Sequence, residues 1–235
     1  MIRRVVVVNA DDFGRSDAIN RGIIEAHEHG IVTSASLMVL WPAAPDAAAY
    51  AREHPELSVG LHVDLGEWVL QDGMWRALYE RVALTERDPL EREIRNQIER
   101  CRDLLGRDPT HLDSHQHVHL REPARSILMG LANELGVPLR HCDPIVRYCG
   151  DFYGQDRHEE PVPGSITTSH LIATLRGLPE GVTELACHPG HVDSLEPSYR
   201  TERAVELRTL CDADVRQALA DERIRLASFH DLNVT

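Results

Sequence analysis

Side chains that can bind a metal ion or transfer a proton occur at four separate places in this sequence, each beside a run of apolar residues. These places are Asp11-Asp12, His62, residues 111–119 and His188. A single histidine at the end of a strand is more often a hydrogen-bonded structural residue than a metal ligand. Four such places at the ends of four predicted strands are hard to explain by packing alone, so we predict that they form one shared site.

The first place follows four consecutive valines at residues 5–8. A run of β-branched residues is typical of a strand that is buried on both faces of a parallel sheet. Two carboxylates do not belong in that interior, so the strand must end at Asp11 and Asp12. The carboxyl ends of parallel strands are where α/β folds carry their chemistry. We therefore expect the later histidines to converge on this pair.

The third place has an alternating pattern. Residues 111, 113, 115, 117 and 119 are His, Asp, His, His and His. They share one side of the chain if the segment stays extended. The residues between them form no consistent apolar face, so the pattern predicts a polar row at the mouth of a barrel. One or two of these histidines can reach a single ion, and the others can orient ligands or bind substrate.

Carboxylates combined with imidazoles suit a divalent cation. The nitrogens favour zinc, nickel or cobalt, and the carboxylate favours magnesium or manganese. Three protein ligands leave coordination positions open for water and a substrate oxygen, which is typical of a catalytic site. A second carboxylate can then accept a proton from the water, and an imidazole can protonate the leaving atom.

The composition excludes several classes of function. The chain has 235 residues and a net charge of −13, which argues against binding to nucleic acids or anionic membranes. It contains no lysine, and this excludes Schiff-base chemistry and Walker-type phosphate loops. Five scattered cysteines without a C-x-x-C pair fit a reducing cytoplasm. The apolar run near the start is too short for a signal peptide or a membrane span. We expect a cytoplasmic protein.

Strand-like and helix-like segments alternate along the chain. After the valine run, strands are expected at residues 31–40, 57–65, 110–117, 137–142, 182–188 and 224–229. Helices are expected at 17–29 (capped by Ser16 and ended by Gly30), 43–53, 89–105, 122–135 (ended by Gly136), 167–178 and 200–221. The segments 66–88 and 143–165 are expected to form a pocket wall and an active-site loop.

No repeat or linker divides the chain, so we predict one domain over residues 1–235. About seven βα units predict an α/β, (β/α) barrel-like fold of parallel strands that resembles a distorted TIM barrel, with an open doubly wound sheet as the alternative.

Several motifs resemble those of the YdjC/ChbG-like carbohydrate deacetylases. They are Asn9-Ala-Asp-Asp-Phe-Gly14, Gly60-Leu-His62, Thr110-His-Leu-Asp-Ser-His-Gln-His-Val-His119 and Cys187-His-Pro-Gly190. The resemblance extends from near the first residue to the last predicted strand. It implies a barrel-like fold and one divalent metal ion, Mg²⁺ or Zn²⁺. It also implies hydrolysis of the acetyl group of an N-acetylated amino sugar or oligosaccharide of the chitooligosaccharide type, and a homo-oligomer.

The resemblance also assigns roles to residues. Matched by motif, Asp12, His62 and His115 are the metal ligands. Asp11 is the general base, and a protonated His188 is the general acid for the departing amine. Neighbouring residues of a strand point in opposite directions, so the chain must bend after Asp11 for both carboxylates to serve one ion.

Three further residues are weaker candidates for substrate binding. Arg140 is expected to hold a sugar hydroxyl or a phosphate, with a surface ion pair as the alternative. Tyr153 is expected to line the sugar site or to pack in the core, and His117 to bind substrate or orient a ligand. Two rival functions remain open at this point. One is a metal-dependent hydrolase of a carbohydrate ester or phosphoester, and the other is a sugar- or metal-binding protein without activity.

Overall fold

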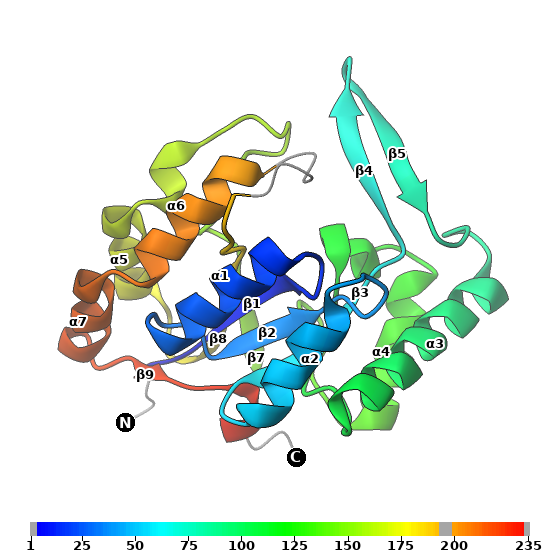
Figure 1. The fold of residues 1–235 in the computed structure, drawn as a ribbon, viewed down its shortest axis with the longest axis horizontal. Coiled ribbons are helices and arrows are strands. Elements are labelled where there is room, and N and C mark those ends of the chain that lie inside the picture. Colours follow the sequence, from blue (N-terminus) through cyan, green and yellow to red (C-terminus); the bar gives the residue numbers. More distant parts are fainter. Residues whose placement is uncertain (1–3, 193–198, 233–235) are drawn as a thin grey trace.

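A computed structural model describes residues 4–192 and 199–232 of the chain. Its centre is a curled, seven-stranded parallel sheet in the order β6-β3-β2-β1-β8-β7, with β9 beside β1 (Figure 1). The strands are β1 (Arg4–Phe13), β2 (Ser34–Leu37), β3 (Ser58–Val63), β6 (Leu112–Ser114), β7 (Val146–Cys149), β8 (Gly181–Cys187) and β9 (Arg225–Leu226). The prediction of a single-domain, barrel-like α/β fold is confirmed, and the curled sheet forms a half-barrel.

Strand β1 is the centre of the sheet. Val6, Val7 and Val8 are fully buried, as the unbroken run of valines predicts. The strand pairs with β2, β8 and β9. Its register with β8 ends at the pair Ala10 and Cys187, so the residues that follow these two lie next to each other at the same edge of the sheet. This register brings the Asp pair and His188 together.

Helices cover the outside of the half-barrel (Figure 1). They are α1 (Asp17–Glu28), α2 (Ala44–Glu53), α3 (Arg87–Leu105), α4 (Ala124–Leu135), α5 (Thr168–Gly177), α6 (Arg200–Leu210) and α7 (Ala213–Asp221). Ser16 caps α1 by accepting the backbone N–H of Ile19, and Gly136 ends α4 in the left-handed conformation, both as predicted.

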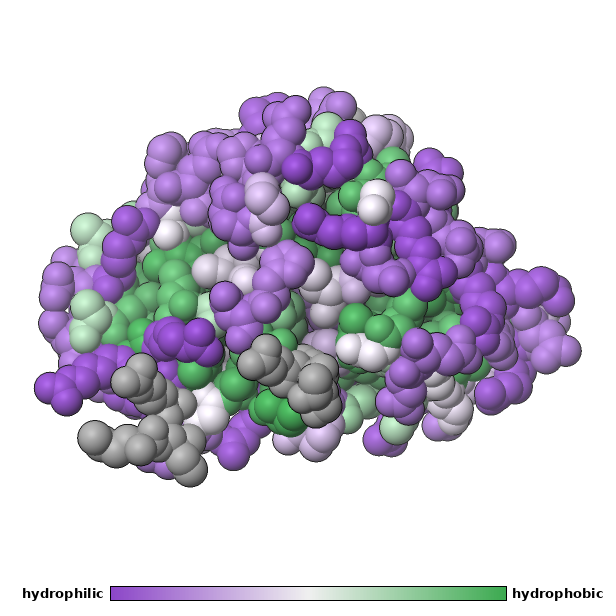
Figure 2. Space-filling model, turned by 90° about the horizontal axis from the view of Figure 1, so that it is seen from below, coloured by the Kyte–Doolittle hydropathy of each residue, from purple (hydrophilic) through white to green (hydrophobic). Residues whose placement is uncertain are grey.

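The exposed surface is mainly hydrophilic, as expected for a chain in which 27% of the residues are charged. Seen from below, hydrophilic residues cover most of the outline of the molecule, with apolar areas between them (Figure 2). Within residues 4–192 and 199–232, no helix combines the length and the apolar character that a membrane span requires.

The segment 66–88 contributes Glu67 to the pocket wall, and it also contains an element that was not predicted. It contains an antiparallel hairpin of β4 (Gly66–Gln71) and β5 (Met74–Glu80). The turn between them is Asp72-Gly73, and both residues have positive φ angles, 52° and 73°. Asp-Gly is a strong signal for a two-residue hairpin turn, and attention to this signal in the sequence would have predicted the hairpin. The hairpin projects from the body of the molecule (cyan in Figure 1).

The predicted strand at 110–117 was too long. The chain leaves the sheet after Ser114 and continues as the 3₁₀ segment η1 (His115–Leu120). Gln116 and His117 have left-handed backbone angles, with φ of 50° and 52°. The alternating residues therefore do not share one side, because periodicity applies only while the chain stays extended.

Three other elements were also predicted incorrectly. Residues 137–142 contribute only an isolated bridge between Leu139 and Leu112, and β7 instead forms inside the segment expected as a loop. The expected helix at 200–221 is two helices, since α6 ends at Leu210 and Asp212 caps α7. The last strand is only two residues long.

A close contact between α1 and the chain after β8 gives a test of this packing. A Cβ atom added to Gly22 would lie 2.4 Å from the Cα atom of Gly190. We expect Gly22→Ala to destabilise the protein by about 1–3 kcal/mol, because neither backbone can yield without moving the segment that carries His188. Gly130→Ala in α4 is the matched control. It meets no atom within 4 Å and should stabilise by about 0.5–1 kcal/mol. Urea unfolding measures both, and equal effects would contradict the packing.

Candidate metal centre

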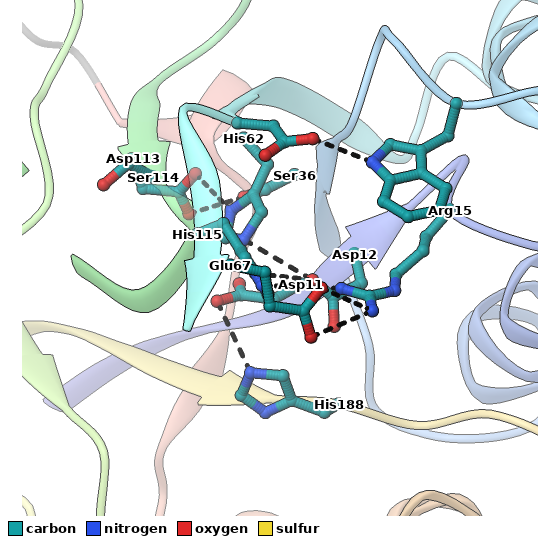
Figure 3. A network of polar contacts seen from close by, with 12 residues as sticks. Asp11, Asp12, Arg15, Ser36, His62, Glu67, Asp113, Ser114, His115 and His188 are labelled. Atoms are coloured by element: carbon teal, nitrogen blue, oxygen red, sulfur yellow. Dashed lines mark hydrogen bonds and ion pairs between the residues drawn. The ribbon is translucent and has the colours of Figure 1, made fainter. Parts of the chain in front are cut away.

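A pocket of about 530 Å³ opens at the carboxyl ends of the strands. Residues from all four predicted places line it, including Asp11, Asp12, His62, His115 and His188. Figure 3 shows their side chains gathered around one space. The convergence that the sequence predicts is thus present in the structure.

Three of these residues form a group that could hold a cation. Asp12 Oδ1 lies 3.3 Å from His115 Nδ1 and 3.6 Å from His62 Nε2. The ligand atoms of the three residues all lie within 4.8 Å of one another. Asp12 Oδ1 is buried and accepts no hydrogen bond of acceptable geometry from the described residues. An orphaned carboxylate oxygen facing two imidazole nitrogens fits a divalent cation.

The bend that the two carboxylates require lies at Asp12 itself. Its φ angle is 68°, and Gly14 follows with a φ of 90°. The register between β1 and β2 shifts between Ala10 and Phe13, which marks the same irregularity. Because Asp12 is left-handed, its side chain turns to the same space as that of Asp11, where a regular strand would point them apart.

His62 is oriented by a carboxylate behind it. Its Nδ1 atom lies 2.8 Å from Asp113 Oδ1, which leaves Nε2 facing Asp12. The β3–β6 register, in which His62 is the partner of Asp113, produces this contact. Burial lowers the pKa of His62, but the carboxylates of Asp113 and Asp11 raise it to about 9. A carboxylate behind an imidazole is a common way to fix a metal-binding histidine.

Asp11 is held by Arg140. The guanidinium donates to both carboxylate oxygens at 2.7 Å. It also pairs with Asp113 and Glu184, each at 2.7 Å. Burial raises the pKa of Asp11, but the Arg140 guanidinium outweighs it and holds the pKa below its usual value. Asp11 is therefore a carboxylate at neutral pH.

The position of Arg140 does not fit its expected contact with a sugar hydroxyl or phosphate. Its side chain is 0% exposed, and it lies behind Asp11 with its charge directed at three carboxylates. The alternative of a surface ion pair does not fit either, because the ion pairs are buried.

His188 faces the other side of Asp11. Its Nε2 atom lies 3.7 Å from Asp11 Oδ2, and its ring packs edge-on against Tyr153 and Tyr199. Burial lowers the pKa of His188 to about 4, although the Asp11 and Asp12 carboxylates oppose this. The imidazole is thus neutral at neutral pH in the resting site, so the protonated form expected of the general acid has to arise during the reaction.

The two remaining candidates lie in the pocket wall. The Tyr153 ring stacks on Tyr199 with 4.5 Å between centroids, and the residue is 37% exposed. His117 Nε2 lies 3.3 Å from the Tyr148 hydroxyl. Burial lowers the pKa of His117 to about 3, so it presents a neutral imidazole to the pocket. Both positions are compatible with contact to a ligand.

Several residues around the site were not identified from the sequence. Arg203 donates a 2.5 Å hydrogen bond to Asp12 Oδ2. Burial alone would raise the pKa of Asp12, but Arg203 and His115 hold it well below its usual range. Glu67 and Arg15 form a buried ion pair beside His115. Each contact joins segments far apart in the chain, and no local pattern marks them.

The sequence is related to known proteins over nearly its whole length. It matches the YdjC-like protein family over residues 5–221. A carbohydrate deacetylase of Geobacillus stearothermophilus is 34% identical over 97% of this chain and 98% of the relative. A chitooligosaccharide deacetylase of Klebsiella pneumoniae is 35% identical over 98% of this chain and 100% of the relative.

Solved structures agree on the fold. A putative cellobiose-phosphate cleavage protein from Enterococcus faecalis superposes with a TM-score of 0.77 at 25% identity, over 97% of this chain and 98% of the other. A family 4 carbohydrate esterase from Streptomyces lividans superposes with a TM-score of 0.58 at 12% identity, over 96% and 92%, which shows a common fold. The motifs and the half-barrel fit the YdjC-like family, and the family match covers most of the length of the chain. This chain therefore belongs to the YdjC-like family.

Proposed function

We propose that this protein is a metal-dependent deacetylase that removes the acetyl group from an N-acetylated amino sugar or oligosaccharide of the chitooligosaccharide type and releases acetate. The observation that carries the proposal is the orphaned Asp12 Oδ1 atom, which faces two imidazoles beside the Asp11–His188 pair. The names of the near-full-length relatives support the choice of substrate.

Asp12, His62 and His115 would hold the cation. Two imidazoles and one carboxylate suit Zn²⁺ better than Mg²⁺, which prefers oxygen ligands and keeps several waters. When bound, the cation would polarise the acetyl carbonyl and make a water molecule more acidic. Arg203 donates to Oδ2 of Asp12, which leaves Oδ1 as the oxygen that would bind the cation.

Asp11 would act as the general base. It is a carboxylate at neutral pH and lies beside the cation ligands, so its Oδ2 atom can accept the proton of the attacking water. Arg140 contacts both of its oxygens and lies outside the pocket wall. We assign Arg140 a positioning role, because it holds the Asp11 carboxylate in one orientation and does not reach the substrate.

His188 would protonate the leaving nitrogen. It is neutral before the reaction, so the proton it donates must arrive during the catalytic cycle. Asp11 Oδ2 lies 3.7 Å from Nε2 and can supply it. The proton that Asp11 takes from water can thus pass to His188 Nε2 and on to the departing sugar amine.

A phosphoester hydrolase is less well supported. A phosphoryl centre recruits cationic side chains to the transferring group. Arg140, the residue expected to serve a phosphate, is fully buried among three carboxylates. Arg15, Arg157 and Arg203 also line the pocket, so the choice of deacetylation over this function rests on the names of the near-full-length relatives.

The first prediction of this proposal concerns the reaction. The protein loaded with Zn²⁺ should release acetate from di- or trisaccharides of N-acetylglucosamine, measured with an enzyme-coupled acetate assay. Chelation should abolish the activity, and added Zn²⁺ should restore it. Aryl phosphates serve as the comparison substrate. Acetate from no acetylated sugar, or faster turnover of the phosphates, would refute the proposal.

The second prediction separates the two carboxylates. Asp12→Asn should lose the metal, because it removes a charged ligand. Asp11→Asn should keep about one equivalent of metal and lower kcat by about 10²–10⁴-fold, the range for loss of a general base. Mass spectrometry of the metal content and the acetate assay measure the two effects. If both variants bind metal like the wild type, Asp12 is not a ligand.

The third prediction concerns the support of His188. Its backbone N–H donates to Glu206 Oε2 at 2.5 Å, and the Tyr199 hydroxyl donates to the other oxygen. Burial raises the pKa of Glu206 to about 8, against the lowering effect of these donors. A glutamate in the unfolded chain has a pKa of about 4.3. The folded state therefore keeps a proton that the unfolded state releases between these values.

The contribution of Glu206 to stability is accordingly complete below about pH 4.3 and is lost as the pH rises through about 8. We expect the free energy of unfolding of the wild type to fall over this window relative to Glu206→Gln, which carries no titrating proton there. Urea unfolding across the window measures the difference. The exposed Glu180→Gln is the control, and parallel curves for the wild type and Glu206→Gln would contradict the account.

A further inference from the structure

The two imidazoles of the candidate metal centre are held in different ways. The His62 ring is fixed through its Nδ1 atom, which lies 2.8 Å from Asp113 Oδ1. On the side of the His115 ring that faces away from Asp12, Glu67 Oε2 lies 3.9 Å from Nε2, outside hydrogen-bond range. The position of the His115 ring therefore depends more on the backbone that carries it.

This backbone turns sharply where it leaves the sheet. Ser114 is the last residue of β6 and pairs with Val63 of β3, and both Ser114 and His115 lie beside the other candidate ligands (Figure 3). His115 opens η1, and the next two residues, Gln116 and His117, are left-handed. Residues other than glycine keep this conformation only where the surrounding structure holds them in it. Contacts that hold the turn therefore determine where the His115 ring points.

The Ser114 hydroxyl closes the turn on its inner side. Its Oγ atom accepts the backbone N–H of His119 at 3.0 Å and lies 2.7 Å from His119 Nδ1. Burial lowers the pKa of His119 to about 4, so the ring is neutral and Nδ1 can accept the hydroxyl proton. Both residues are buried. One side chain at the end of the sheet thus holds a residue five positions further along, and the loop between them contains His115.

The turn has a second attachment on its outer side. The Gln116 side chain accepts the backbone N–H of Trp68 at 2.9 Å and donates to the Trp68 carbonyl at 2.7 Å. These contacts attach the turn to the base of the β4–β5 hairpin, but they are exposed to solvent. The contacts between Ser114 and His119 are buried, where a hydrogen bond is stronger than in water. Ser114 is therefore the stronger of the two restraints.

We propose that Ser114 is a positioning residue for the metal centre: its hydroxyl binds His119 and so holds the left-handed turn in which His115 Nδ1 faces Asp12 Oδ1. These two atoms are 3.3 Å apart. Without the hydroxyl, the turn can relax from its left-handed angles and carry the imidazole away from Asp12. His115 is thus positioned through its backbone, whereas His62 is positioned through its ring. This inference rests on the metal site of the proposed function.

The test is the affinity for Zn²⁺, measured by competition with a chromophoric chelator. We expect Ser114→Ala to weaken Zn²⁺ binding by about 10- to 100-fold, the range for loss of a group that orients a metal ligand. Ser58→Ala is the matched control. The Ser58 hydroxyl is also buried and accepts a backbone N–H, that of Phe229 at 3.1 Å, but it lies at the start of β3, and His62 lies near the end of that strand. This variant should bind Zn²⁺ within about twofold of the wild type.

Two further readouts distinguish positioning from a general loss of structure. Circular dichroism reports whether each metal-free variant is folded. If Ser114→Ala is not, His119→Phe decides, because it removes Nδ1 and keeps an aromatic ring beside His117 and His141. A loss of about fivefold is expected there, equivalent to one hydrogen bond. The visible spectrum of the Co²⁺-loaded protein should change in Ser114→Ala and remain that of the wild type in Ser58→Ala.

Two outcomes would overturn the inference. One is a Zn²⁺ affinity within about twofold of the wild type in the folded variants of Ser114 or His119. The other is an equal loss of affinity in Ser58→Ala, because removal of any buried serine hydroxyl would then explain the effect.

These measurements use the metal without substrate. If Zn²⁺ binds and its affinity depends on Ser114 but no acetylated sugar is hydrolysed, the proposed function fails and the role of Ser114 stands. If the sugar is hydrolysed and Zn²⁺ binding does not depend on Ser114, only this inference fails. A wild-type protein that binds no divalent cation would refute both.

Discussion

The left-handed backbone at Asp12 is the constraint on which the site depends. A non-glycine residue in this conformation costs about 1–2 kcal/mol, although Asp tolerates it better than most residues. Contacts on both sides of the bend stabilise it. Arg203 binds Asp12 Oδ2, and the Asn20 side chain accepts the N–H of Gly14 at 2.7 Å. Without the bend, Asp11 and Asp12 would face opposite sides of the sheet, and no single ion could lie beside both.

The charges around the bend explain why Asp11 and Asp12 are assigned different roles. Arg140 lies behind Asp11 and contacts three buried carboxylates, so this cluster has more negative than positive groups. Burial raises the pKa of its third member, Glu184, to about 7, although Arg140 opposes this. Asp12 has Arg203 on one oxygen and the imidazoles of His62 and His115 near the other. A cation beside Oδ1 would offset the remaining negative charge, in keeping with the assignment of Asp12 to metal binding and Asp11 to proton transfer.

The sequence predicted the parts of the site that follow from local pattern. The valine run located β1, its end located the Asp pair, and the strand ends located His62 and His188. It failed where the backbone departs from regular structure, because nothing in the alternation of residues 111–119 indicates left-handed angles at Gln116 and His117. It also failed for partners distant in sequence. Arg140 lies 129 positions from Asp11, and its burial against that carboxylate depends on the folded sheet.

The most direct test of the central claim is the position of the metal. Crystals grown with Zn²⁺ and measured at the zinc absorption edge should show one anomalous peak at about 2.0–2.2 Å from Asp12 Oδ1, His62 Nε2 and His115 Nδ1. Asp11 should remain on Arg140 and outside the ligand set. A peak on the Asp11–Asp113 side of His62, or no peak in the pocket of a protein that hydrolyses acetylated sugars, would contradict the account.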